Sequence, residues 1–291
     1  MIKSFVVNES ERIDKLLAEA FPKYSRSYFQ WLIEEGVVLR NGAPIKKREL
    51  PKVGDEIQVT FQEVESIALE PEAIPLDILY EDEAIICINK PAGMVVHPAP
   101  GHPNGTFVNA LLHHCRSLPP QDMRPGIVHR LDKETSGVLL AAKTVKAHQK
   151  LIEMFSARKI EKEYLAITIG NPGNKTVDLP IGRHPVRRKE MAVCDKGRSA
   201  ITHIEMLKVE GEFALVKAKP VTGRTHQIRV HLKALKTPVL GDRVYGSEKL
   251  SDKLGIQRHL LHAHRITFSH PITGEKISLE APIPDDFATW C

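Results

Sequence analysis

Apolar residues near the start of the chain recur first with helical and then with strand-like spacing. In chain order, the pattern predicts helices over 12–21 and 25–36 and strands over 37–39 and 57–59. Pro22 separates the two helices, Gly36 ends the second, and Asn41 with Gly42 predicts a tight turn between the strands. These elements predict a compact α/β unit within residues 1–66. A unit this small usually depends on a partner or a ligand for stability.

An acidic, proline-containing stretch follows and predicts an interdomain linker over 67–75. From residue 76 onward strand-like runs dominate, over 84–88, 138–142, 164–169, 200–206 and 213–216. Two amphipathic patterns predict helices over 145–155 and 225–235. Because strands and helices do not alternate strictly, residues 76–291 are predicted to form an α+β domain around a mixed, mostly antiparallel sheet.

Composition disfavours several classes of protein. The 291 residues are 42% hydrophobic and 26% charged, which is ordinary for a globular chain. No apolar run approaches the ~20 residues that a membrane span needs, and the first residues lack the apolar core of a signal peptide. The four cysteines lie far apart without a C-x-x-C pair, which disfavours a disulfide framework and a thiolate zinc site. Free thiols and no membrane attachment fit a cytoplasmic protein.

The net charge of the chain is only +5, but positive residues are concentrated in two stretches. The stretch 213–241 contains no acidic residue and six lysines and arginines, and a second basic cluster lies at 183–189. Such clusters suit a polyanion, and phosphate is the commonest one in the cell. On charge alone, a solvated basic face is the simpler interpretation.

An aspartate with two cationic neighbours lies just ahead of the 138–142 strand. The chain there reads His-Arg-Leu-Asp-Lys-Glu-Thr-Ser-Gly over residues 129–137. An aspartate in a loop that enters a buried strand can be held rigidly, as a nucleophile or base must be. Arg130 and Lys133 would keep the Asp132 carboxylate ionised. The alternative is a polar turn with a solvated ion pair.

The helix predicted over 225–235 begins beside a glycine and an arginine. Gly223 permits a sharp turn, and Arg224 at the helix start could project into a cleft. Arg229, Lys233 and Lys236 fall opposite the apolar stripe, so they predict a basic outer face. Such a face is usually just solvated, and nucleic-acid contact is the alternative.

A tyrosine begins the predicted strand 164–169. Tyr164 follows three charged residues. A tyrosine in this position is most often a core residue with a hydrogen-bonded hydroxyl. If Tyr164 faces a cleft instead, its ring could stack on a nucleobase, which is worth ~1–3 kcal/mol per base.

Motifs for metals and nucleotide cofactors are not found. The histidines at 113–114 and at 259, 262 and 264 lack the His-x-x-x-His spacing with a recognisable third ligand. No Walker-type or dinucleotide-binding glycine loop occurs. The sequence therefore predicts no metal and no nucleotide cofactor.

Together these segments resemble the RluA family of RNA pseudouridine synthases. The motifs H-R-L-D-x-x-T-S-G and G-R-x-H-Q-I-R-x-H are highly specific, and the matching segments occur in the family's order. They are 89–98, 129–137, 162–166, 223–231, 241–246 and 261–263. Residues 12–17 and 25–36 resemble an S4 RNA-binding domain. Residues 97–113 are most similar to the subgroup that acts on large-subunit ribosomal RNA.

The resemblance implies a cofactor-free isomerisation. The family breaks the N1–C1′ bond of uridine, turns the uracil and joins its C5 to C1′. Asp132 matches the catalytic aspartate, which could attack C1′, add to the base or abstract a ribose proton. Arg224 matches the arginine expected to pair with it, Tyr164 the tyrosine that packs on the base, and Arg130 a residue placed where the flipped uridine was. Extruding a uridine costs a few kcal/mol.

The expected substrate is large-subunit (23S) ribosomal RNA, or its assembly precursor, bound without an obligate protein partner. Two alternatives remain at this point. One is a synthase for other ribosomal or transfer RNA uridines, and the other is a non-catalytic RNA-binding or ribosome-assembly factor that keeps the fold. A binding protein has no need of Asp132, so this carboxylate discriminates between the two classes.

Overall fold

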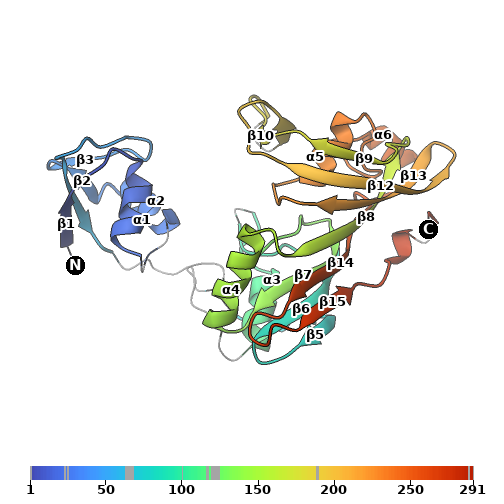
Figure 1. Cartoon of the computed structure of the whole chain (residues 1–291), viewed down its shortest axis with the longest axis horizontal. Helices are drawn as coiled ribbons and strands as arrows, with labels where there is room; N and C mark the ends of the chain where they lie inside the picture. Colours follow the sequence, from blue (N-terminus) through green and yellow to red (C-terminus); the bar gives the residue numbers. More distant parts are fainter. Residues whose placement is uncertain are drawn as a thin grey trace. The chain divides into compact units, whose positions relative to one another are not determined.

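The chain divides into two compact units, Met1–Ala68 and Leu69–Cys291 (Figure 1). This computed structural model describes the chain except residues 1, 23, 25, 63–68, 100, 116–117, 119–124, 188–189, 288 and 291, and the side chain of Ser27. No helix in the described part of the chain is long and apolar enough to cross a bilayer.

The first unit is a small sheet beside two helices. Its elements are β1 (Ile2–Val6), α1 (Ile13–Ala20), α2 (Arg26–Glu34), β2 (Val38–Arg40), β3 (Ala43–Pro44) and β4 (Glu56–Thr60). The sheet order is β1-β4-β2-β3, with all pairs antiparallel. Both predicted helices form, and β1 is a strand that the sequence reading did not predict. Four of its five residues are exposed. Its sequence also shows no clear alternation of apolar and polar positions, which is the signal that predicts a strand.

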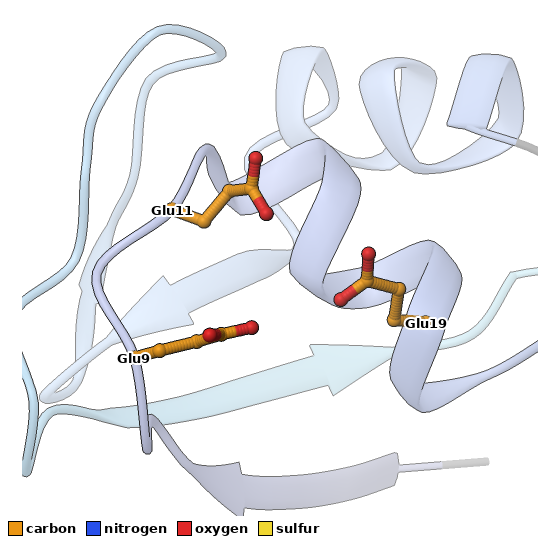
Figure 2. A group of neighbouring side chains, drawn as sticks. All are labelled: Glu9, Glu11 and Glu19. Atoms are coloured by element: carbon orange, nitrogen blue, oxygen red, sulfur yellow. The ribbon is translucent and has the colours of Figure 1, made fainter.

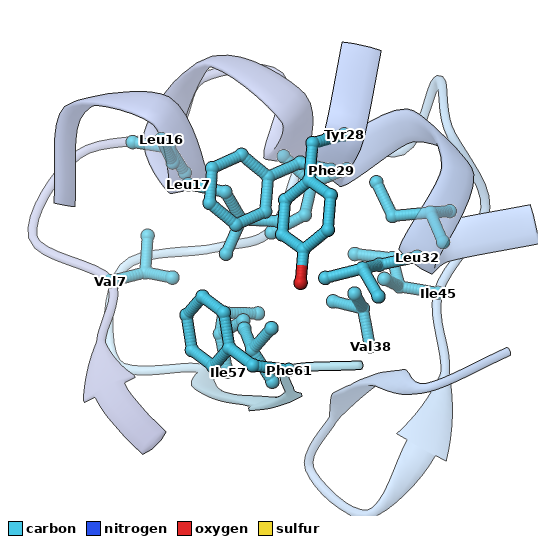
Figure 3. Packing of buried hydrophobic residues seen from close by; sticks show 13 residues of the cluster. Val7, Leu16, Leu17, Tyr28, Phe29, Leu32, Val38, Ile45, Ile57 and Phe61 are labelled. Carbon is cyan, nitrogen blue, oxygen red and sulfur yellow. The ribbon is translucent and has the colours of Figure 1, made fainter. Parts of the chain in front are cut away.

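The core of this unit lies between the helices and the sheet (Figure 3). Leu17, Phe29 and Ile57 are fully buried there. The two helices are also joined by the buried carboxylate of Asp14, which accepts hydrogen bonds from Arg26 (2.8 Å) and Gln30 (2.6 Å). The periodic apolar face and this polar tie explain why the helices pack as a pair.

The second unit is built around one large sheet. Its elements are β5 (Ile78–Glu81), β6 (Ile85–Lys90), α3 (Phe107–His114), β7 (Ser136–Ala142), α4 (Val145–Ser156), β8 (Glu161–Ile169), β9 (Lys175–Asp178), β10 (Ile181–Arg183), β11 (Met191–Val193), β12 (Ile201–Glu210), β13 (Phe213–Pro220), α5 (Gln227–Ala234), α6 (Glu248–Lys253), β14 (Leu261–Ser269), β15 (Lys276–Glu280) and a 3₁₀ turn at Asp285–Phe287.

The nine strands of this sheet run in the order β5-β6-β7-β14-β8-β13-β12-β9, and β15 pairs with β14. Among the described strands every pair is antiparallel except β7–β14, which is parallel. The predicted mixed, mostly antiparallel α+β sheet is therefore confirmed. The β10–β11 hairpin forms a separate two-stranded ribbon.

The close approach of β7 and β14 depends on a glycine. Gly137 has φ +107°, and a Cβ added there would lie 2.2 Å from the carbonyl oxygen of Ala263. A larger residue would therefore push the parallel pair apart. Since Asp132 lies just ahead of β7, this glycine helps to fix where that aspartate sits.

Helix α3 was not predicted. Thr106 caps it, with its hydroxyl accepting from the backbone of Asn109, while the Asn109 side chain accepts from the backbone of Thr106. This threonine followed by apolar residues is the signal that could have identified the helix. Asn109 also donates to the carbonyl of Glu70, and the backbone N–H of Glu72 donates to the carbonyl of Asn109. Residues 70–72 of the predicted linker are thus tied to the second unit, while 67–68 lie outside the described residues.

Candidate active site

All four predicted site residues line one pocket of the second unit. The cavity has a volume of about 540 Å³ and is bounded by the 128–132 loop, the end of α4, the start of β8 and the 220–229 segment. Arg130, Asp132, Tyr164 and Arg224 all contribute to its wall. Segments about a hundred residues apart in sequence therefore meet at one opening.

Asp132 is joined to a buried arginine on the first turns of α5. Nη1 of Arg229 donates to Oδ2 of Asp132 at 3.0 Å. The other side of the same guanidinium makes a bidentate pair with Asp242, at 2.7 Å from Nε and 3.0 Å from Nη2. The Asp242 carboxylate also accepts the backbone N–H groups of Val244 and Tyr245. Asp242 thereby fixes Arg229, and Arg229 fixes Asp132.

The expected pairing of Asp132 with Arg224 is wrong. Arg224 precedes α5, and its Nε donates to the carbonyl of Ser199 at 3.0 Å. The helix begins only at Gln227, so its first turns bring Arg229 rather than Arg224 to the carboxylate. The predicted basic outer face is also wrong for Arg229, whose side chain is only 6% exposed.

Sequence reasoning missed Arg229 because helical periodicity counts every arginine as polar. Asp242, in the Gly241–Gly246 segment, was the available signal. A carboxylate that becomes buried needs a cationic partner, and Arg229 is the partner of Asp242, whose side chain is 0% exposed.

Asp132 carries a negative charge at neutral pH. Burial by itself would raise the pKa of Asp132, but the imidazole of His226 once it is protonated in acid, and the charge and hydrogen bond of Arg229 at every pH, hold it below the ordinary value. Burial lowers the pKa of His226, so this imidazole is neutral at neutral pH. Arg229 is therefore the lasting positive charge beside Asp132, because guanidinium does not deprotonate in proteins. The result is a desolvated, ionised carboxylate facing a pocket.

Comparison with known proteins identifies the family. The model of the RNA pseudouridylate synthase family matches residues 84–234, which contain Asp132, Tyr164 and Arg229. The model of the S4 domain matches residues 11–57 of the first unit. The chain belongs to the RluA-type RNA pseudouridine synthases. It is therefore an isomerase acting on RNA, with an N-terminal S4 domain, and a non-catalytic role no longer stands as an alternative.

Relatives of the synthase match nearly its whole length. The uncharacterized RNA pseudouridine synthase YlyB of Bacillus subtilis is 43% identical over 96% of this chain and 93% of its own. Ribosomal large subunit pseudouridine synthase D of Escherichia coli is 42% identical over 95% of this chain and 88% of its own. Among solved structures, human RNA pseudouridylate synthase domain containing 1 matches with a TM-score of 0.59 and 26% identity, covering 72% of this chain and 84% of that one.

His226 completes the surroundings of Asp132 in the synthase. Its backbone lies in the left-handed region, with φ 56°, directly ahead of α5. Nδ1 lies 2.7 Å from the hydroxyl of Tyr245, which itself accepts the backbone N–H of Met191 at 2.9 Å. With that N–H bound, the Tyr245 hydroxyl is free to donate to Nδ1. The imidazole proton then sits on Nε2, which faces Oδ1 of Asp132 at 3.8 Å.

Tyr164 projects from the sheet into the pocket. On β8 it lies opposite Ala218 of β13 and Ala263 of β14, so small residues flank it on both sides. Burial and the charge of Asp132 raise the pKa of the Tyr164 phenol. Its hydroxyl therefore remains protonated at neutral pH.

The loop that carries Asp132 is fixed by side chains from distant segments. Lys90 donates to the carbonyl of Lys133 at 3.1 Å, and Arg258 donates to the carbonyl of Glu134 at 3.0 Å. The hydroxyl of Thr135 lies 2.8 Å from Nε2 of His259. None of these contacts was predicted. His259 thus has a hydrogen-bonding role in this loop.

Two other clusters of charged residues, one basic and one acidic, have partners of opposite charge within the chain. Of the predicted basic cluster 183–189, residues 188–189 lie outside the described residues, and Arg187 pairs with Glu190 at 3.3 Å. In the S4 domain, carboxylate oxygens of Glu9, Glu11 and Glu19 gather within 4.8 Å of one another (Figure 2). Lys15 pairs with Glu11 and with Glu19, so a cation of the chain already compensates this exposed group.

Proposed function

We propose that this synthase converts specific uridines of large-subunit (23S) ribosomal RNA to pseudouridine, with Asp132 as the catalytic carboxylate. The observation that carries the proposal is the ionised Asp132, held by Arg229 at 3.0 Å in a pocket of about 540 Å³. The choice of RNA is supported by the names of relatives. Those of Escherichia coli and Xanthomonas campestris, each 42% identical over at least 94% of this chain, are called ribosomal large subunit pseudouridine synthase D.

The pocket suggests a role for each of its side chains. A paired uridine must leave its stack before the partly buried carboxylate of Asp132 can reach it. Exposed Arg130, at the pocket wall two residues from Asp132, is suited to occupy the vacated position. The ring of Tyr164 packs on the extruded uracil. Asp132 attacks C1′, adds to the base or abstracts a ribose proton, and each of these steps requires its negative charge.

Mapping of pseudouridine in total RNA from cells with and without the gene tests the substrate. The proposal expects pseudouridine to disappear at discrete positions of large-subunit ribosomal RNA and to return when the gene is restored. Complementation with Asp132→Asn should leave those positions unmodified. Loss confined to transfer RNA or to small-subunit ribosomal RNA would contradict the proposed substrate without touching the assignment to the family.

Substitution of Tyr164 separates stacking from hydrogen bonding. Tyr164→Phe should retain activity to within about tenfold, because one net hydrogen bond is worth about 1 kcal/mol. Tyr164→Ala should lose more, since base stacking contributes ~1–3 kcal/mol. Single-turnover rates on a ribosomal RNA transcript make the comparison. Equal and complete loss in both variants would instead assign the hydroxyl an essential role.

Removal of residues 1–66 should affect RNA binding more than chemistry. The core of the first unit consists only of residues 7–61, and the buried clusters of the second unit contain none of them. We therefore expect the remaining chain to fold and to show a KM raised by about 10²-fold or more, as when one of two linked binding modules is lost. Steady-state kinetics should show little change in kcat. A truncated chain that binds RNA normally but is inactive would contradict this division of roles.

A further inference from the structure

Beside Arg130, three further arginines at the pocket have no acidic partner among the described residues. Arg158, Arg198 and Arg224 all line the cavity that contains Asp132. Among the described residues, no carboxylate oxygen lies within 4.0 Å of a side-chain nitrogen of any of the three, whereas Arg229 and Arg243 each contact two carboxylates. Unpaired cations that gather at one opening are unfavourable unless an anion joins them.

Arg224 lies in the same pocket wall as Arg158 and Arg198, within reach of both positive charges. Burial lowers the pKa of Arg224, and the positive charges of Arg198 and Arg158 lower it further. These charges come from three different elements: the turn after α4, the segment ahead of β12 and the segment ahead of α5. The fold itself therefore brings them together, because no two of them are neighbours in sequence.

Contacts with the backbone position two of the three arginines, Arg224 and Arg198. Nε of Arg224 donates to the carbonyl of Ser199, beside Arg198. The backbone of Arg198 exchanges two hydrogen bonds with Ile181, at 2.9 and 3.0 Å. The first contact restricts the Arg224 side chain before any ligand arrives, and the second pair fixes the backbone from which Arg198 projects, which favours binding of an anion between them.

Arg158 occupies a strained position. It follows the C-cap of α4 with φ 59°, in the left-handed region where glycine is the usual residue. The N–H of Lys159 then closes the helix on the carbonyl of Met154 at 2.9 Å. An arginine at this position costs more than glycine would. That cost is understandable if its guanidinium serves the pocket.

We propose that Arg158, Arg198 and Arg224 together bind one backbone phosphate of the RNA next to the extruded uridine. This inference rests on the proposed function. A phosphodiester offers two oxygens to guanidinium groups in paired hydrogen bonds, and its charge relieves the repulsion within the cluster. Asp132 and Asp242 share the single charge of Arg229, so that side of the site is net negative. The arginine cluster thus attracts phosphate, while the Asp132, Arg229 and Asp242 group repels it. This difference orients the strand with its sugar and base toward Asp132.

The number of phosphates that the arginine cluster contacts can be measured from how steeply RNA affinity falls with salt concentration. The full chain and its Arg158→Gln, Arg198→Gln and Arg224→Gln variants, single and combined, are titrated with a large-subunit ribosomal RNA transcript at several salt concentrations. Loss of one phosphate contact should reduce the slope of log K against log [salt] by about 0.7–0.9. Because the phosphate is shared, the triple variant should lose about one such step. Arg243→Gln removes an exposed arginine paired with Glu248 and Asp252 and should leave the slope unchanged.

An unchanged salt slope in the triple variant would overturn the proposal. A slope reduced by about three times the change expected for one phosphate would also overturn it, because that result indicates three separate phosphates. The three side chains are at least partly exposed, so the variants should melt like the parent chain. Each single variant should lose less than one step, because the other two arginines still hold the shared phosphate, and a full step lost in every single variant would contradict the proposal. Binding driven by phosphate does not depend on the base sequence. The measurement therefore remains valid if the modified RNA is not ribosomal, and Asp132→Asn, which tests catalysis, should keep the parental slope.

Discussion

Pseudouridine formation by Asp132→Asn should be slower by about 10²–10⁴-fold or more, the range lost when a group acting directly on the reacting atoms is disabled. Asparagine has nearly the same shape as aspartate, and its oxygen can still accept the hydrogen bond from Arg229. Only the negative charge is removed. Since the pKa of Asp132 lies below its ordinary value, the parent enzyme carries that charge throughout the neutral range. Binding of RNA should be nearly unchanged or slightly tighter, because a negative charge near the phosphates has gone.

Glu134→Gln provides the matched control for this experiment. Glu134 lies in the same loop, two residues from Asp132. Its backbone carbonyl accepts from Arg258, and the charge of its carboxylate favours the protonated form of buried Lys90. The substitution removes one negative charge from the loop but leaves that carbonyl in place. Single-turnover assays should therefore show activity close to that of the parent chain. Normal turnover by Asp132→Asn, or an equal loss in both variants, would refute the assignment of Asp132.

The candidate site could be predicted from sequence only where a residue belongs to a local motif. Arg130 and Asp132 share one loop, and the turn at Gly223 placed Arg224 near a cleft, so these residues were found together with Tyr164. The partner of Asp132 could not be chosen this way. Whether Arg224 or Arg229 reaches the carboxylate depends on the residue at which α5 begins. The start follows the left-handed His226 and is fixed by the Gln227 side chain, which accepts from the backbone N–H of Arg224 and donates to the distant carbonyl of Ile201. Apolar spacing carries none of this information.

The fold shows the same division between local and distant determinants. The two helices of the S4 domain and the helices α4 and α5 were predicted, since their apolar faces repeat with clear helical spacing. Helix α3 was missed because its buried residues include Phe107, Val108 and Asn109 in succession, which hides the spacing. A buried polar residue such as Asn109 is explained only by its partners, here Thr106 and Glu70.

Removal of Arg229 should destabilise the chain and stop catalysis at the same time. In Arg229→Gln the buried carboxylate of Asp242, whose side chain is 0% exposed, loses its only ion-pair partner among the described residues. Leaving a buried charge without its partner lowers the free energy of unfolding by about 3–5 kcal/mol. Denaturant unfolding should show this as a lower midpoint. Asp132 also loses its lasting counter-charge, so its pKa should rise because burial then dominates.

A second substitution separates the two effects. In Arg229→Gln/Asp242→Asn the buried charge is gone, and the asparagine oxygen still accepts the N–H groups of Val244 and Tyr245. The double variant should therefore regain much of the lost unfolding free energy, whereas its activity should stay low because Asp132 remains without its arginine. Arg224→Gln serves as the control: its guanidinium contacts a carbonyl rather than a carboxylate, so it should weaken RNA binding and leave stability unchanged. Recovery of activity together with stability would mean that Arg229 supports only the fold, and that Asp132 keeps its charge without it.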